Sequence, residues 1–290
     1  MANIAAIVAR KAKNDEAWRA QRQADRENYS AMQDSAITEI TSNPDLYAEY
    51  LNLQGDNPTY SPGNIAMVIG QVEYSGEVVK FGTADRWAAL GRRVLDSEKQ
   101  RGMMIFARSK NYRGYDLTPV YDLEQTSGRP LKEISLLEGS EKMETALATL
   151  LNYSVVPVEI DSTMKIAAYY DDKNLTLAIN PEFSDHETFA ALATEIALSR
   201  MHGKGRVRDF NREDFQLDAE SISYILCRRF GIDRPLPDAK NIAALYDGYN
   251  SQERRTGLDQ IQDMCKQIGN NIERSIEPPQ KTRATGRGAM

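Results

Sequence analysis

The sequence has few of the residues that would point to a metal cluster, a disulfide framework or a membrane. Only two cysteines and two histidines occur among its 290 residues. Cys227 and Cys265 lie in helical patterns, and their spacing matches neither a disulfide framework nor a zinc cluster. No run approaches 18 consecutive apolar residues, and the apolar stretch at the start is too short and weak for a signal peptide. We therefore expect a cytoplasmic protein with no membrane partner.

An overall excess of positive charge is also missing. Lys and Arg number 36 against 42 for Asp and Glu, which gives a net charge of −6. Any binding of nucleic acid must then come from a local basic patch. Hydrophobic residues make up 41% of the chain, which is enough to fill a core, and the length allows one large domain or two medium ones.

Helix and strand signals in the first half predict an α+β domain over residues 1–138, with helices at its N-terminus. Pro44 begins a clear helix that reaches Leu53. Short mixed segments follow. They are a helix that opens at Ser61, a helix over 85–93, and strands near 103–107 and 120–123.

A second α+β domain is expected over residues 139–276. It begins with a helix over 141–151 and a β-hairpin with strands at 165–170 and 175–180. Three helices follow, over 185–202, 214–230 and 252–276. The remaining residues, 277–290, carry Lys281, Arg283 and Arg287 with no acid after Pro279, and we expect a flexible basic tail that could touch nucleic acid.

The helix over 185–202 is where a catalytic metal would be sought. Ser184 and Glu187 form a capping-box signal at its start, and Gly203 is a stop signal. A hairpin, this helix and a second helix that supplies an acid follow the plan of a zincin-type peptidase. There an HExxH motif places two histidines on one helix face, and its Glu activates the metal-bound water. The corresponding string here is Thr194-Glu195-Ile196-Ala197-Leu198, without either histidine.

Further motifs extend this likeness to most of the chain. In the second half they are Asp218-Ala219-Glu220-Ser221-Ile222-Ser223-Tyr224-Ile225-Leu226-Cys227 and Phe230-Gly231-Ile232-Asp233. In the first half they are Tyr60-Ser61-Pro62-Gly63-Asn64, Gln71, Trp87, Gly91-Arg92, Val94, Arg101-Gly102, Tyr121-Asp122 and Gln125-Thr126. Together they span roughly residues 40–275, and their order resembles the ArdC-like antirestriction family of mobile elements.

That resemblance implies an N-terminal domain that binds single-stranded DNA, followed by a zincin-like metallopeptidase domain. The family's third zinc ligand, the Glu of an AES-type motif, would correspond to Glu220. Only one of three protein ligands is then present, because Leu198 has no lone pair and Thr194 is at best a poor ligand for zinc. We expect no bound zinc, although active relatives use it. Glu195 remains either as a vestigial general base or as an ordinary polar residue.

Neither histidine can take the place of the missing ligands. His202 lies about 12 Å along the helix axis from Thr194, and His186 is as far away on the other side. We expect both histidines to be exposed near the helix ends.

The candidate DNA-binding residues combine positive charge with aromatic rings. Between Arg86 and Arg113 the basic residues exceed the acids by six, and the same stretch carries Phe106 and Tyr112. Cations can follow the phosphates of a single strand while aromatic faces stack on its bases. The candidates are Arg86, Trp87, Arg92, Arg93, Lys99, Arg101, Arg108, Lys110, Arg113, Asn64 and Gln125.

These residues also have a structural interpretation. In it, Trp87 and Phe106 belong to the core, the arginines form a solvated face, and Asn64 and Gln125 cap helices and turns.

These observations leave three candidate functions. The first, which we favour, is a single-stranded-DNA-binding, antirestriction-type accessory protein with an inactive peptidase-like half that is structural or binds a host or element-encoded protein. The second is a metallopeptidase with non-standard ligands. The third is a protein-binding pseudoenzyme without DNA binding.

Overall fold

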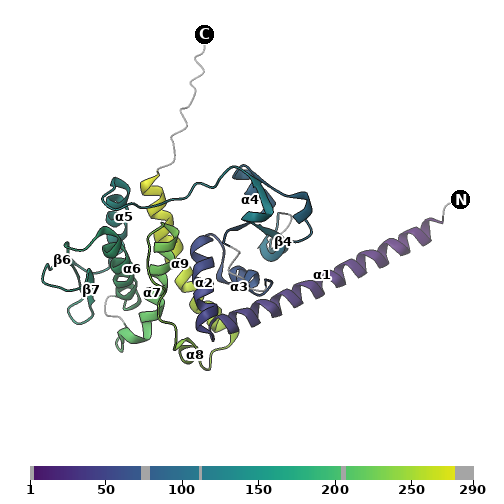
Figure 1. The fold of residues 1–290 in the computed structure, drawn as a ribbon. Coiled ribbons are helices and arrows are strands. Elements are labelled where there is room, and N and C mark those ends of the chain that lie inside the picture. Colours follow the sequence, from purple (N-terminus) through teal and green to yellow (C-terminus); the bar gives the residue numbers. More distant parts are fainter. Residues whose placement is uncertain (1–2, 73–78, 111–112, 204–206, 278–290) are drawn as a thin grey trace, which may run out of the picture. The chain divides into compact units, whose positions relative to one another are not determined.

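The computed structural model describes residues 3–72, 79–110, 113–203 and 207–277, and it is an α+β fold (Figure 1). Two compact units make up the chain. Unit 1 comprises Met1–Lys132 and Ala239–Asp259, and unit 2 comprises Glu133–Asp238 and Gln260–Met290. The segment Ala239–Asp259 is thus grouped with unit 1, whereas the sequence-based division placed it in the second domain.

Unit 1 begins with three helices, α1 (Ile4–Ile40), α2 (Pro44–Asp56) and α3 (Pro62–Ile69). The predicted start of α2 is confirmed, because the Asn43 side chain accepts hydrogen bonds from the first backbone N–H groups and Pro44 occupies the first turn. Ser61 caps α3 in the same way. These two helices contact α1, whose buried residues all lie in its last turns.

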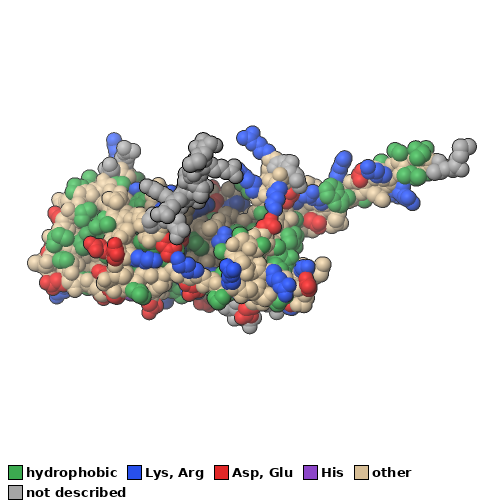
Figure 2. Space-filling model, turned by 90° about the horizontal axis from the view of Figure 1, so that it is seen from above, with side chains coloured by type: hydrophobic (Ala, Val, Ile, Leu, Met, Phe, Trp, Pro, Cys, Tyr) green, Lys and Arg blue, Asp and Glu red, His purple; other side chains and the backbone are tan. Residues whose placement is uncertain are grey.

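The first half of α1 is exposed, and no hydrophobic periodicity in the sequence predicted a helix of this length. Hydrophobic, basic and acidic side chains alternate along it (Figure 2). Asn3 caps its start by accepting a hydrogen bond from the Ala6 N–H group.

A small antiparallel sheet follows the helices, in the order β1 (Phe81–Thr83), β4 (Tyr115–Asp122), β3 (Met103–Arg108). A separate ribbon pairs β2 (Arg92–Val94) with β5 (Thr126–Gly128). Unit 1 also contains two short 3-10 turns, η1 (Asp96–Glu98) and η2 (Leu123–Gln125), and the helix α8 (Ile242–Leu245).

The predicted helix over 85–93 is wrong in its last part. Helix α4 (Ala84–Ala89) stops early, and Arg92 already belongs to β2. The cause is Gly91, whose φ of +75° lies in the left-handed region and therefore ends the helix.

Unit 2 contains α5 (Glu141–Leu151), the strands β6 (Val158–Ile160), β7 (Ala168–Asp171) and β8 (Thr176–Ile179), and the helices α6 (Asp185–Met201) and α7 (Arg212–Arg229). The sheet order is β6-β8-β7. The predicted hairpin is confirmed, since β7 and β8 pair in antiparallel register. Strand β6, which the sequence did not reveal, pairs parallel to β8.

The core of unit 2 is built around α6. This helix packs along α7 and against β7, so that every residue from Leu192 to Ser199 is buried. Its predicted capping box between Ser184 and Glu187 is present, and Gly203 after its end has a φ of +61°. The last helix, α9 (Ser251–Ile276), contributes its residues from Gln260 onward to unit 2.

Both cysteines are buried and free. Burial raises the pKa of the Cys227 thiol to about 11, which disfavours a reactive thiolate. Among the described residues, no helix is both long enough and apolar enough to cross a membrane.

Candidate functional site

Glu195 of α6 is a buried carboxylate with two fixed partners. Its side chain is 7% exposed. Oε2 accepts a hydrogen bond of 2.8 Å from the backbone N–H of Tyr170 in β7. Oε1 forms an ion pair with the guanidinium of Arg212, in the first turn of α7. The carboxylate thus links α6 to β7 and α7 and is almost fully buried.

A second guanidinium lies at Thr194, the residue that the sequence analysis compared with the first histidine of HExxH. Nη1 of Arg234 donates to Thr194 Oγ1 at 3.1 Å and to the Ala190 carbonyl at 3.0 Å. It also bonds to the hydroxyl of Ser223 in α7. The positive charge of Arg234 therefore lies next to Thr194, one of the positions that would have to bind a metal cation.

The donor set does not fit zinc. Leu198 is fully buried and offers no donor atom, while Glu220 accepts a 2.7 Å hydrogen bond from Gln216 within α7. Catalytic zinc needs three protein ligands from His, Cys, Asp or Glu. In the part of the chain that the structure describes, no group of three such residues could hold a metal ion.

The expectation that both histidines are exposed is wrong. His202 is buried, with Nδ1 at 2.7 Å from the Tyr170 hydroxyl and its ring stacked on Phe210 at 4.3 Å. His186 is partly buried, and its Nε2 bonds to the Leu136 carbonyl. Both rings therefore have structural partners, and those of His202 come from β7, through Tyr170, and from the segment before α7, through Phe210.

In unit 1, two of the candidate DNA-binding residues stabilise the fold. Trp87 is 2% exposed, and its indole N–H donates to the Tyr121 carbonyl at 2.9 Å. The guanidinium of Arg92 lies over this ring and bonds to the carbonyls of Leu123, Thr126 and Arg129. Trp87 thus belongs to the core of unit 1, and the half-buried Arg92 links the backbone around η2 and β5.

The two amide candidates are also engaged with backbone. Asn64 in α3 accepts from the N–H of Phe106 and donates to its carbonyl, at 3.1 and 3.0 Å. Gln71 does the same for Met104, two residues earlier on the edge strand β3. These side chains pair with the edge of β3 as a neighbouring strand would. Gln125 forms the capping box of η2 with Asp122.

The remaining basic candidates are exposed, but some are already paired. Lys99 bonds to Asp96, Arg101 to Glu98 and Lys110 to Asp85. Arg86 lies over the ring of Tyr60. Three exposed arginines form no ion pair with any described residue and are therefore the most available to bind a phosphate: Arg93, Arg108 and Arg113.

The hairpin β3–β4 brings charge and aromatic rings to one face. Arg108 pairs directly with Tyr115, and Phe106 with Leu117, so these four side chains share a face of the sheet. Tyr115 is 56% exposed and Phe106 is partly exposed. We call Phe106, Arg108, Tyr115 and Leu117 the hairpin face.

Sequence reasoning missed Tyr115, because its relation to Arg108 depends on strand register. Arg212 and Arg234 were missed as well, and no sequence signal could have placed them at α6. The aromatic candidate Tyr112 lies outside the described residues.

Comparison with known proteins returns solved structures alone, since no protein-family model and no curated protein matches the chain. The chain is similar to an antirestriction protein. The crystal structure of antirestriction ArdC protein from R388 plasmid, in its Mn(II)-bound form, is 18% identical, with a TM-score of 0.48 over 87% of this chain and 99% of that one. Its metal-free structure is 16% identical, with a TM-score of 0.43 over 75% and 85%. ArdC is also the family that the sequence motifs resemble.

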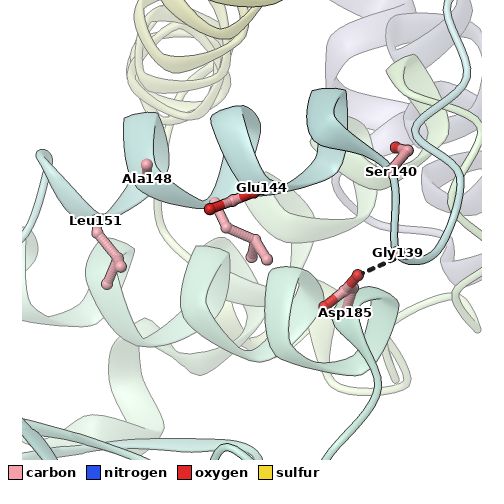
Figure 3. A pocket seen from close by; sticks show the side chains of 7 residues that line it. Gly139, Ser140, Glu144, Ala148, Leu151 and Asp185 are labelled. Carbon is pink, nitrogen blue, oxygen red and sulfur yellow. Dashed lines mark hydrogen bonds between the residues drawn. The ribbon is translucent and has the colours of Figure 1, made fainter.

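A cavity of about 440 Å³ in unit 2 lies between α5 and the start of α6 (Figure 3). Leu147, Ala148 and Leu151 supply its apolar wall, and Glu144 and Asp185 its polar part. Asp185 already accepts a 2.8 Å hydrogen bond from the Gly139 N–H group. No ligand chemistry is evident in this cavity.

Proposed function

We propose that this chain is a single-stranded-DNA-binding accessory protein of antirestriction type from a mobile element, and that its α6–α7 centre does not operate as a zinc peptidase. The hairpin face carries this proposal. Arg108 and Tyr115 are opposite each other and exposed, and Phe106 adds a second ring on the same face. The antirestriction part rests on the motif order of the sequence.

The chemistry of the hairpin face suits a single strand better than a duplex. An unpaired base exposes a ring face that can stack on Tyr115 or Phe106, at about 1–3 kcal/mol per base, and stacking of this kind tolerates any sequence. Arg93, Arg108 and Arg113, which form no ion pair with a described residue, can each release a counterion from a phosphate. Because the net charge of the chain is −6, binding depends on such local contacts rather than on the overall charge.

The surroundings of α6 support the proposed absence of peptidase activity. A catalytic Glu must reach a metal-bound water, yet both carboxylate oxygens of Glu195 are engaged, by Tyr170 and Arg212. The guanidinium of Arg234 at Thr194 adds repulsion against a divalent cation. Unit 2 then serves as a structural or partner-binding module.

DNA binding is tested by fluorescence anisotropy with a labelled single strand and the matching duplex at two salt concentrations. We expect the single strand to bind more tightly, Arg108→Ala to reduce the salt slope by about 0.7, and Tyr115→Ala to weaken binding by roughly tenfold. Arg274→Ala and Tyr249→Ala remove the same groups from exposed positions elsewhere and should change nothing. Equal affinity of both variants and the parent would exclude the hairpin face.

The peptidase alternative is tested by metal content. The purified protein should contain well under one zinc per chain and should not cleave casein. Stoichiometric zinc with hydrolysis that disappears in Glu195→Gln would establish a peptidase with unusual ligands instead. A protein that binds neither DNA nor zinc would leave the protein-binding pseudoenzyme as the remaining function.

A further inference from the structure

Unit 2 contains a second cavity, of about 390 Å³, that is separate from the Glu195 centre. It lies between the end of α6, the first half of α7 and the part of α9 that follows Asp259. Its volume is at the lower end of the range for small-ligand sites. Asp218 is two residues from Glu220, which points it to a different side of α7.

Asp218 is an unpartnered carboxylate in the wall of this cavity. It forms no hydrogen bond or ion pair with any residue in the described part of the chain, and it is partly buried. A carboxylate in such a place costs free energy unless a partner supplies the missing hydrogen bonds. Asp263 on α9, which is exposed, adds a second negative charge to the lining.

The rest of the lining suits a flat cation on an apolar stem. Phe215 offers a ring whose orientation is fixed by stacking on Phe210, with centroids 5.3 Å apart. Met201 and Met264 supply flexible, polarisable side chains that adapt to an inserted group. A guanidinium can form a two-pronged bond with a carboxylate and stack on an aromatic ring, whereas an ammonium is a strongly hydrated point charge.

We propose that this cavity binds the side chain of an arginine presented by a partner polypeptide. The guanidinium would bond to Asp218 and lie against Phe215, while its methylene stem would contact Met201 and Met264. The net charge of −6 also favours a basic partner. This extends the partner-binding role suggested for unit 2 and is independent of DNA binding by unit 1.

The test uses the full chain with ¹³C-methyl-labelled methionines and a blocked Gly-Arg-Gly tripeptide. We expect saturable shifts of the Met201 and Met264 methyl signals, assigned by Met→Leu substitution. The same peptide with citrulline, which has nearly the same shape without the charge, should bind at least tenfold more weakly. Asp218→Asn should cause a similar loss, whereas Asp247→Asn, at an exposed position in unit 1, should not.

Three outcomes would overturn the proposal. They are equal affinity for the arginine and citrulline peptides, equal affinity for a lysine peptide, and shifts that avoid Met201 and Met264. The citrulline comparison uses the unaltered protein, so it decides even if a variant fails to fold. Single-strand binding measured on Asp218→Asn should equal that of the parent, so that failure of either proposal can be recognised separately.

Discussion

Replacing Glu195 with Gln separates a structural role of this carboxylate from a catalytic remnant. Gln keeps an oxygen that can accept from the Tyr170 N–H, but it loses the charge opposite Arg212 and turns an amide NH₂ toward that guanidinium. A hydrogen bond to a charged group contributes about 1.5–3 kcal/mol. Arg212 is 29% exposed, so water can partly replace the carboxylate, and the loss should stay below the roughly 3–5 kcal/mol of a fully buried broken pair. We expect a loss of about 2 kcal/mol.

Hydrogen–deuterium exchange measures this loss of stability at the elements that Glu195 contacts. The amides of β7 and α6 are expected to exchange through global unfolding of unit 2. In Glu195→Gln the peptides that cover these elements should then exchange about 30-fold faster, and the thermal midpoint should fall. Glu182→Gln, an exposed acid just before α6, should stay within about 0.5 kcal/mol of the parent. Unchanged protection in Glu195→Gln would refute the view that this carboxylate holds strand and helices together.

Three further predictions follow from the same contacts. Arg92→Ala should destabilise unit 1 by about 1–3 kcal/mol in urea unfolding, because it leaves several carbonyls unpaired. We expect the double variant Thr194→His with Leu198→His to bind zinc only when Arg234→Ala also removes the nearby cation. Metal analysis measures the zinc content, and zinc binding with Arg234 intact would contradict this prediction. Burial raises the pKa of Asp218 to about 6, above its unfolded value of 3.8, so its ionisation lowers stability as the pH rises from about 4 to about 6. Asp218→Asn should therefore be more stable than the parent by about 1–3 kcal/mol at pH 8, and this gain should shrink between about pH 6 and 4 and vanish at lower pH.

Local signals in the sequence were sufficient for most of the regular elements. The N-caps at Asn43, Ser61 and Ser184 and the β7–β8 hairpin depend on side chains within a few residues of each other, so their patterns survive without knowledge of the fold. That positions 194 and 198 in α6 are not histidines is likewise evident from the sequence alone. The helix pattern over 85–93 gave a wrong C-terminal end, because the single residue Gly91 ends the helix there.

The partners of the candidate residues were decided by tertiary structure. Glu195 faces Tyr170 and Arg212 because β7 and α7 pack on α6, and Arg234 reaches Thr194 from a loop 40 residues away. Likewise Asn64 forms hydrogen bonds with the edge of β3, 42 residues away in the sequence. Charge and residue type in the sequence indicate which groups could react or bind. Burial and hydrogen bonding between distant segments determine which of these groups are available to do so.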